Sequence, residues 1–511
     1  MGIVWGAGTL MSESRKNSRA VRPLAEALET RQLLAASLKG VDLSGNHWLL
    51  RLSGPGDLSV TQQPNTANPN GVPLGTPGLI DTITMTGTDP LHSRVYGKVT
   101  QKGSGSDGRV FFAHMTQIGG ISPNVSGANL GLKLIDMPGF YLGQTSTSTT
   151  ATEPNISIPQ GVMTFRFGGA DTTYTPTGGT PLNQNANADT FVINLGLPYS
   201  WGTSIVVDTV TTDAQAASSS TTSPTQDGVE FLVAGRINTF QANQIKGNSQ
   251  FPSSGFLGGG GTIVQANQEQ LRALVGPIGF VQVGGNATNF SVQTEDKISN
   301  YYVGGITNNV QLLAVAGSRT VEFGKGMDSV TIYTNSIDTL QANAGAVGSN
   351  VTSGQQIKRV TIGGDVTNTN ILAGYDQKLS TIFSNQSVPT TFNAQSTAAI
   401  KNVLIGGSIK DSIFAAAVQP SNGAYDSPQA MFFPHSYIHA KVEGTIDNST
   451  AAPDKPKQAF FAKQVAVTRG PVNPPNVPEA PYTNNGAPPY GHRVGAGLQP
   501  TVPGTYKVSK K

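Results

Sequence analysis

Two stretches of this chain, Val360-Thr-Ile-Gly-Gly-Asp-Val366 and Val403-Leu-Ile-Gly-Gly-Ser-Ile409, decide its fold. In each stretch apolar residues alternate with other residues, and a glycine pair interrupts the alternation. This pattern is typical of a strand, a tight corner and a second strand. Looser copies of the pattern lie at residues 231–237, 281–287 and 301–307.

The copies recur at a nearly constant interval. The glycine pairs that begin at Gly284 and Gly304 are 20 residues apart, and the two stretches quoted first are 43 residues apart, close to two such steps. Ile237-Asn-Thr-Phe-Gln-Ala-Asn243 returns 100 residues later as Ile337-Asp-Thr-Leu-Gln-Ala-Asn343. Units of this length, each made of two strands and a corner, stack on their neighbours in solenoids. The sequence therefore predicts an all-β fold, a parallel β-solenoid of the β-helix-like kind.

Composition agrees with many short strands and turns. The chain has 511 residues with 61 glycines, no cysteine and only 12% charged residues. The lack of cysteine excludes a disulfide scaffold, a thiolate metal site and a cysteine nucleophile. Beyond the first 40 residues only the stretch 265–275 (QANQEQLRALV) has a helical pattern. No run of about 18 apolar residues occurs, so the sequence predicts no membrane span.

The sequence divides into three parts. Residues 1–37 form a basic, amphipathic segment with the composition of a targeting sequence. Residues 38–450 form the predicted solenoid, which is irregular and loop-decorated over 38–227 and regular over 228–450. Residues 451–511 hold eleven prolines and predict an extended, basic, disordered tail. We expect both end segments to lie outside the packed body.

Polar insertions interrupt the irregular part. Residues 143–155, 172–189 and 213–227 consist almost wholly of Ser, Thr, Asn, Gln, Ala and Pro. Such stretches cannot bury enough apolar area to fold on their own, so we expect loops there. Two interpretations of this part stay open, namely earlier rungs of one solenoid or a separate β-sandwich.

Charge is unevenly distributed along the chain. The net charge is +3, but residues 1–40 carry +3 and residues 451–511 carry +6, which leaves the body between them at −6. Basic ends on an acidic body suggest that the ends contact an anionic cell-surface polymer, and they argue against a nucleic-acid groove along the body. A solvated surface with basic tails of no function is the alternative.

The first segment contains a recognisable motif. A basic stretch, Ser14–Arg22, leads into the amphipathic helical pattern of residues 23–35, without the apolar run that a standard signal peptide requires. Leu28-Glu-Thr-Arg-Gln-Leu-Leu-Ala35 resembles the L-E-x-R-x-L-L-A motif near the start of large exported proteins of planctomycete bacteria. The resemblance implies export or sorting to the cell envelope. An ordinary amphipathic helix is the alternative, and Met11 is an alternative start just before the basic stretch.

Four residues make the best candidate catalytic constellation. Parallel β-helix enzymes that act on polysaccharides place several carboxylates and a basic side chain on neighbouring rungs. Asp365 and Asp411, with Lys358 and Arg359 nearby, are the closest match in this sequence. Structural roles at corners, where Asn and Asp bond local backbone, are the alternative for these carboxylates. We expect Asn286, Asn308, Asp365 and Asn368 to stack as such corner ladders.

Other patterns carry less chemistry. The glycine-rich stretch Gly255–Thr262 lacks the Lys-Ser/Thr of a phosphate-binding loop, and no G-x-S-x-G motif occurs. His435 and His439 have a spacing that zinc sites use on helices, but the surroundings favour a strand and no third ligand is near. On a strand the two histidines also share a face, so a surface metal stays an alternative. Four tyrosines near predicted corners suit stacking on sugars if they form a row, or ordinary positions if they do not: Tyr301, Tyr302, Tyr375 and Tyr425.

These observations predict a non-enzymatic, exported structural or adhesive protein of the bacterial cell envelope or extracellular matrix. A polysaccharide-active β-helix enzyme, either a lyase or a glycoside hydrolase, is the alternative, and a paralogue of a giant surface protein with partner-binding loops is a third. No catalytic, cofactor-binding or metal-binding residue is assigned, and cell-surface polysaccharide or other envelope proteins are the candidate partners. For the fold, we expect buried side chains at Ile362, Val366, Ile405 and Ile409, and the same alternation places Ile413 inside.

Overall fold

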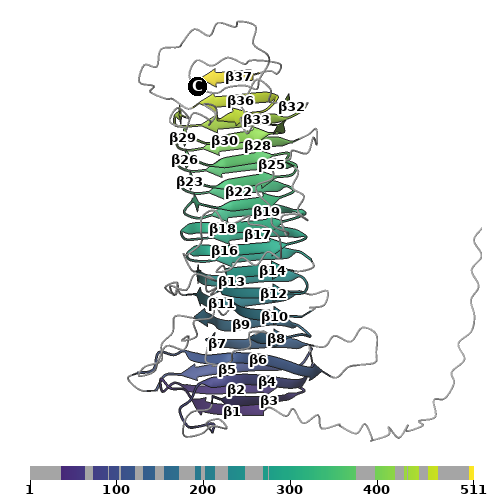
Figure 1. Ribbon diagram of the computed structural model, residues 1–511, viewed down its shortest axis with the longest axis vertical. Coiled ribbons are helices and arrows are strands. Elements are labelled where there is room, and N and C mark those ends of the chain that lie inside the picture. Colours follow the sequence, from purple (N-terminus) through teal and green to yellow (C-terminus); the bar gives the residue numbers. More distant parts are fainter. Residues whose placement is uncertain are drawn as a thin grey trace, which may run out of the picture. The chain divides into compact units, whose positions relative to one another are not determined.

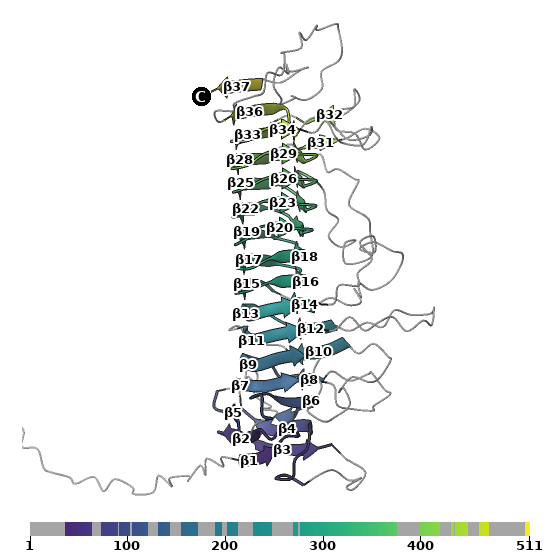
Figure 2. The ribbon, with the colours of Figure 1, turned by 90° about the vertical axis from the view of Figure 1, so that its left-hand side faces the viewer.

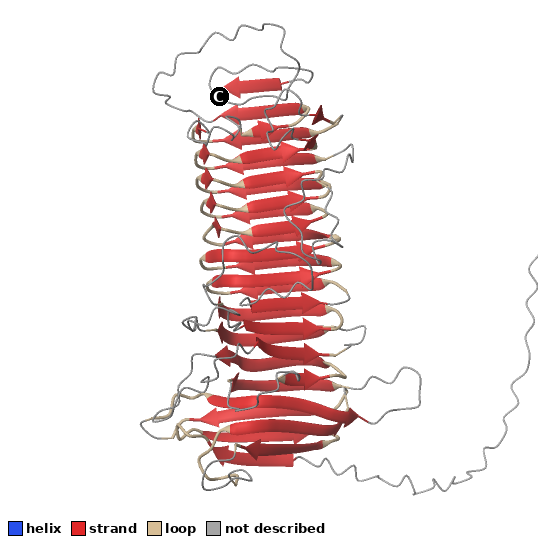
Figure 3. Ribbon diagram, in the orientation of Figure 1, coloured by secondary structure: helices blue, strands red, loops and turns tan. Residues whose placement is uncertain are grey.

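The computed structural model describes residues 36–63, 73–89, 91–102, 105–120, 131–143, 155–171, 190–196, 202–212, 228–247, 269–273, 276–375, 398–419, 431–433, 435–447, 459–469 and 506–510. Every regular element in these ranges is a β-strand (Figure 3). The all-β prediction is confirmed. Within the same ranges no helix could span a membrane. The export-like motif at 28–35, the three polar insertions and Tyr425 lie outside the described residues, apart from the ends of the first insertion.

Most strands stack one above another in two parallel ladders, seen from two sides in Figures 1 and 2. The first ladder contains β5 (Arg94–Thr100), β7 (Leu132–Leu142), β9 (Val162–Asp171), β11 (Thr203–Thr211), β13 (Ile237–Lys246), β15 (Ile278–Val283), β17 (Lys297–Val303), β19 (Gly317–Phe323), β22 (Ile337–Ala342), β25 (Gln356–Ile362), β28 (Ala399–Ile405), β33 (Tyr437–Val442), β36 (Gln464–Arg469) and β37 (Tyr506–Lys510).

The second ladder contains β4 (Ile80–Thr88), β6 (Val110–Gly120), β8 (Ile156–Ile158), β10 (Thr190–Leu195), β12 (Gly228–Val233), β14 (Glu269–Ala273), β16 (Ala287–Thr294) and β18 (Thr307–Ala314). Above β18 it continues as two series of shorter strands, because a corner now divides each strand. One series is β20 (Met327–Asp328), β23 (Ala346–Val347), β26 (Val366–Thr367), β29 (Ile409–Lys410) and β34 (Ile446–Asp447). The other is β21 (Thr331–Thr334), β24 (Asn350–Ser353), β27 (Asn370–Ala373), β30 (Ile413–Ala416) and β35 (Phe460–Phe461).

Hydrogen bonding closes a parallel barrel of ten strands in the lower part of the stack. Its circuit runs β6–β7–β9–β11–β13–β16–β14–β12–β10–β8 and back to β6, and the other strands lie outside it. The circuit closes because β13 spans both ladders: residues 237–242 pair with β15, and Ile245 pairs with Ala287 of β16. On the other side, Val110 of β6 pairs with Phe140 of β7. The sequence predicted stacked rungs and no closed barrel. Because the ladder pairing β11–β13 joins residues 203–211 to residues 237–246, the irregular and regular parts share one sheet.

Equivalent residues of successive units lie in register and fill the core. One interior column of the first ladder consists of Ile237, Ile278, Ile298, Ser318, Ile337, Ile357, Ile400, Ile438 and Val465. Ile362, Val366, Ile405 and Ile409 are all fully buried, as predicted. Period-2 alternation in a strand with one face inside causes this pattern.

Within the barrel, phenylalanine fills the interior. The rings of Phe231 and Phe240 lie 5.3 Å apart, and those of Phe240 and Phe290 lie 6.0 Å apart. Offset and edge-on ring pairs of this kind add to the stabilisation from burial alone. One predicted interior position is wrong: Ile413 is half-buried, because it pairs with Asn370 in the ladder and the buried residue beside it is Phe414.

The glycine pairs lie at the predicted corners between strands, and close packing between successive units explains why they are glycines. They do not adopt the left-handed conformation; instead successive pairs stack in close contact. A Cβ on Gly304 would lie 2.4 Å from the backbone oxygen of Gly284, and one on Gly406 would lie 2.4 Å from that of Gly363. The left-handed positions come slightly later, in a column made of Asn289, Asn309, Ser329, Gly348, Asn368 and Asp411. Asn, Asp and Gly tolerate this conformation best.

Antiparallel strands close the lower end of the stack. β1 (Ala36–Val41) pairs with β2 (His47–Ser53), which pairs with β5, and β3 (Asp57–Gln62) pairs with β4. A separate small sheet joins β31 (Val418–Gln419) to β32 (Met431–Phe432).

Two further expectations about local structure are wrong. Residues 269–273, inside the stretch with a helical pattern, form strand β14, because β12 and β16 pair with it on either side. The ladder also continues past residue 450. β36 pairs with β33 through six residues, and Ala459, Phe460 and Phe461 are fully buried, so the packed body reaches into the segment predicted as a tail. The apolar runs within that segment outweigh its high proline content.

Candidate functional site

The predicted carboxylates are not brought together. Asp365 precedes β26 and is exposed; its Oδ1 accepts a 2.7 Å hydrogen bond from the backbone N–H of Ser408. Asp411 follows β29 and occupies a left-handed corner, with φ +48°. Since Val366 pairs with Ile409, the two aspartates lie at opposite ends of this short ladder step. Each therefore has a corner role, the alternative that the sequence left open.

The basic members of the predicted constellation lie elsewhere on the surface. Lys358 forms an ion pair with Asp338 on the neighbouring strand, with 2.7 Å between Nζ and Oδ1. Arg359 is exposed and level with Thr339 in the first ladder. The two carboxylates thus lie at corners on either side of β26 and β29, whereas the two cations lie on β25 of the first ladder.

The predicted polar corner ladders form in part. The amide of Asn308 donates to Asp328 over 3.1 Å, and the side-chain oxygen of Asn286 accepts the N–H of Ile306 over 2.8 Å. The direct amide-to-amide ladders involve other residues. Asn309 donates to Asn289 over 2.7 Å, and Asn370 donates to Asn350 over 2.8 Å.

The histidine and tyrosine candidates form no site among the described residues. His435 and His439 are both exposed, and no group of three metal-ligating side chains occurs within the described ranges. Tyr301 lies fully buried in the core, Tyr302 faces outward, and the Tyr375 hydroxyl donates to the carbonyl of Val418 over 2.7 Å in a small apolar cluster. The three described tyrosines therefore do not form a stacking row.

A polar cluster that the sequence did not indicate lies on the barrel. The Tyr141 hydroxyl donates to Asp208 Oδ2 over 3.0 Å, and the Asn243 amide donates to Asp208 Oδ1 over 2.5 Å. The guanidinium of Arg109 lies 5.0 Å from the centre of the Tyr141 ring and donates to Asp171 over 3.2 Å. Four strands, β7, β9, β11 and β13, and the residue before β6 supply these side chains.

A glycine makes the cluster geometrically feasible. The Tyr141 ring starts on β7 and reaches Asp208 on β11 by crossing β9 at Gly168. A Cβ at Gly168 would lie 2.4 Å from that ring, so any larger residue would displace it. Burial, and then the negative charge of Asp208, raise the pKa of Tyr141 to about 12. Tyr141 therefore stays protonated at neutral pH and acts as a hydrogen-bond donor.

Next to this cluster the outer face of the first ladder is hollowed. The hollow has a volume of about 460 Å³, and its polar lining includes Arg166, Asp208, Gln241, Asn243 and Gln282. Its Arg166 also forms an ion pair of 3.5 Å with Asp136 on the adjacent strand. Carboxylates and a guanidinium thus share one face here, and the arrangement can hold a polar ligand.

The spacing of residues in the sequence did not predict this cluster. Its members are separated by insertions of unequal length, so Tyr141 and Asp208, which are 67 residues apart, have no common interval with Asn243. The glycine pair at Gly168 and Gly169 was the one local sign of a close approach.

Comparison with known proteins assigns the chain to no family. The chain matches no protein-family model, and neither the curated proteins nor the solved structures that were compared with it include a match.

Proposed function

We propose that this chain is a non-enzymatic, exported structural or adhesive protein of the bacterial cell envelope or extracellular matrix, built as a parallel β-solenoid. In this proposal the two ladders are opposite faces of one coil, and each unit of about 20 residues is one turn of it. The closed barrel is the part where long, bent strands link the two faces. The export motif at 28–35 supports the location through its resemblance.

One observation carries the proposal: the polar residues at the corners are used to hold the stack together. Asn286, Asp365 and Ser408 occupy equivalent corners, and each accepts a backbone N–H from the next unit, over 2.8, 2.7 and 3.1 Å. At a second corner, the buried hydroxyls of Ser349 and Ser412 accept a backbone N–H from the preceding unit. Side chains used in this way stabilise a long scaffold and are not free for catalysis.

The proposal is tested by locating the protein in the organism that encodes it. We expect it in the envelope or matrix fraction, and we expect a purified sample to release no reducing ends or unsaturated products from a polysaccharide panel. Recovery only from the cytoplasm would contradict the location. Turnover of any polysaccharide would contradict the non-enzymatic role.

A polysaccharide-active enzyme is the second candidate, and one observation favours it. Asp136 and Asp208 flank Arg166 along one face of the barrel, beside the hollow of about 460 Å³. Paired carboxylates with a basic side chain are what glycan-cleaving sites require. If turnover is found, Asp208→Asn should abolish it while Asp365→Asn leaves it unchanged. Turnover that is insensitive to Asp208→Asn would exclude this site as the catalytic one.

A further inference from the structure

The outer face of the antiparallel end sheet is unusually basic. Strands β1, β2 and β5 carry Lys39, Arg51, Arg94 and Lys98, and none of the three strands contains an aspartate or a glutamate. Lys39, Arg51 and Lys98 are exposed and Arg94 is half-buried. The body as a whole carries −6, so this face is a local exception to its surroundings.

The strand register gathers these cations. Leu49 of β2 pairs with Lys39 on one side and with Lys98 on the other, and Arg51 pairs with Tyr96. Residues in register on adjacent strands have Cβ atoms about 4.5–5.5 Å apart. The cationic groups therefore surround two outward apolar side chains, Leu49 and Tyr96, which are 39% and 36% exposed. We call these side chains, with Arg94, the basic face.

Three outward cations elsewhere are neutralised by carboxylates on neighbouring strands. Arg166 pairs with Asp136, Arg272 with Glu230 and Lys358 with Asp338 in this way. None of the ion pairs among the described residues involves a cation of the basic face. Their positive charge is therefore available to an external anion.

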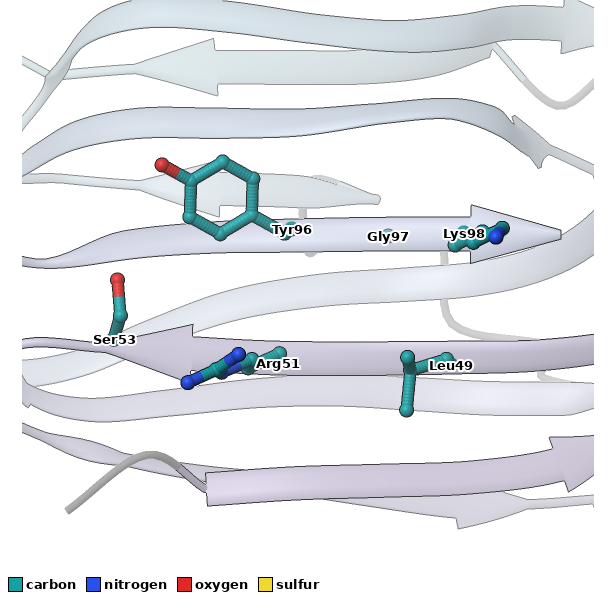
Figure 4. Close-up of a pocket in the computed structure, with 6 residues that line it drawn as sticks. All are labelled: Leu49, Arg51, Ser53, Tyr96, Gly97 and Lys98. Carbon is teal, nitrogen blue, oxygen red and sulfur yellow. The ribbon is translucent and has the colours of Figure 1, made fainter.

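The basic face is also hollowed. Figure 4 shows Leu49, Arg51 and Ser53 on one strand and Tyr96, Gly97 and Lys98 on the next, around a hollow of about 370 Å³. Gly97 faces inward, because a Cβ there would meet Met137 and Phe140 at 2.7 Å. The exposed lining is thus two cations, a hydroxyl, an aromatic ring and an aliphatic side chain.

We propose that the basic face binds an acidic polysaccharide, a linear glycan with carboxylate or sulfate groups. This inference rests on the proposed function, and it assigns the ligand class and the site. Arg51 and Lys98 pair with the anionic groups, while the Tyr96 ring and Leu49 contact the apolar faces of sugar rings and Ser53 bonds a hydroxyl. Apart from Lys39, the site lies outside the basic end segments to which the charge distribution of the sequence pointed.

Nucleic acid is the less favoured ligand. A duplex is long and stiff, and it would extend from this face along a body that carries net negative charge, which repels phosphates. A flexible glycan can bind within the face alone. The lining also offers an aliphatic contact and a hydroxyl beside the ring, which suit a sugar better than a phosphate backbone.

Binding of the purified full-length chain to labelled alginate, a linear polyuronate, tests the proposal, with dextran sulfate, neutral dextran and double-stranded DNA as comparisons. We expect alginate and dextran sulfate to bind and neutral dextran not to bind, with affinity falling as salt rises. Arg51→Gln with Lys98→Gln should weaken alginate binding by about ten-fold or more, and Tyr96→Ala alone by several-fold. The matched control, Arg319→Gln with Lys325→Gln, removes two exposed cations from another place and should change little.

The outcomes separate the alternatives. Unchanged alginate binding in the Arg51/Lys98 variant, or equal loss in the control variant, would overturn the assignment of the site. DNA binding at least as tight as alginate binding and insensitive to Tyr96→Ala would overturn the glycan assignment in favour of general polyanion binding. If the double variant proves unstable by circular dichroism, Lys39→Gln with Lys98→Gln replaces it. Because purified protein is used, a negative result leaves the test of cellular location unaffected.

Discussion

Asp365 Oδ1 accepts the backbone N–H of Ser408 over 2.7 Å, and Ser408 Oγ in turn accepts the backbone N–H of Thr445 over 3.1 Å. Each acceptor stands at the same corner of its unit, one step along the stack from its donor. The side-chain oxygen matters at this corner, whereas the negative charge does not, since Asn286 and Ser408 perform the same task without one. One of the two carboxylates that the sequence offered as catalytic candidates is therefore a structural acceptor.

Replacing Asp365 tests this interpretation. Asp365→Ala removes the acceptor and should lower the free energy of unfolding by roughly 1 kcal/mol, since the Ser408 N–H keeps access to solvent. Asp365→Asn keeps an oxygen in place and should cost less. Urea unfolding midpoints of the two variants give the comparison. Equal destabilisation by both would mean that the charge, and not the hydrogen bond, is what the corner requires.

Ile405 and Leu404 are neighbours on β28 with opposite environments. Ile405 is fully buried, whereas Leu404 is 39% exposed on the outer face. Ile405→Ala should lower stability by about 2–5 kcal/mol through lost burial and a cavity, and Ile405→Asp should prevent folding of this region. Leu404→Ala is the control and should change stability by less than about 0.5 kcal/mol. Similar losses at both positions would contradict the inside–outside assignment.

A column of buried hydroxyls links consecutive units at the second corner. The N–H of Val330 donates to Ser349 Oγ over 3.1 Å, and the N–H of Thr369 donates to Ser412 Oγ over 3.1 Å. Ser412 is fully buried, so Ser412→Ala leaves the Thr369 N–H without this acceptor in a dry environment. We expect a loss of about 1–3 kcal/mol, as for an unsatisfied buried donor. Ser412→Thr, which keeps the hydroxyl, is the control.

Hydrogen exchange at Thr369 provides a local measurement of the same effect. The backbone amide should exchange markedly faster in Ser412→Ala than in the parent protein, because its acceptor is gone. An unchanged exchange rate together with unchanged stability would show that the hydroxyl column does not support the stack.

The stability of the antiparallel end sheet should depend on pH through Asp42. Asp42 is 4% exposed, and burial raises the pKa of its carboxyl above the ordinary 3.8, although hydrogen bonds from Asn46 partly oppose the shift. A raised pKa means that the folded state holds the proton more tightly than the unfolded state. The stability from this group is therefore fully present below pH 3.8 and is lost as pH rises through the raised pKa.

The comparison with Asp42→Asn isolates this contribution. As pH rises from about 3 to 7, the stability of the parent protein relative to the variant should decline, because only the parent must ionise a buried carboxyl. Thermal melts of both proteins across that range provide the measurement. A relative stability that rises with pH would show that the hydrogen bonds from Asn46 outweigh burial.

Local patterns in the sequence were sufficient for the strands and their buried faces. Alternation placed Ile362 and Ile405 inside, because in a strand a residue's neighbours two positions away share its face. The column of buried hydroxyls could also have been predicted from the sequence. Ser349 and Thr369 are 20 residues apart, and Ser412 follows 43 residues later, which is the spacing of the glycine pairs. The local pattern gave a wrong prediction where neighbouring strands determine the secondary structure. The residues of β14 have a helical pattern, but they form a strand because β12 and β16 pair with them on both sides.

Contacts between units of unequal length could not be predicted from the sequence. Tyr141 meets Asp208 only because Gly168 lies between them in space, and insertions hide that alignment in the sequence. The closed barrel depends on the pairing of the last residues of β13 with β16, which no single residue marks in the sequence. The basic face was missed for a related reason: the charge of the body sums to −6, and only the register of β1, β2 and β5 shows that four cations lie together.

Surface proteolysis of intact cells tests the central claim, that this is an exported protein that acts outside the cytoplasm. Cells of the organism that encodes the chain are treated with a protease that does not enter them, and the released peptides are identified by mass spectrometry beside a cytoplasmic marker protein. The account predicts peptides from residues 36–469 in the released fraction while the marker stays intact. Release of this protein only after cell lysis, together with the marker, would contradict it.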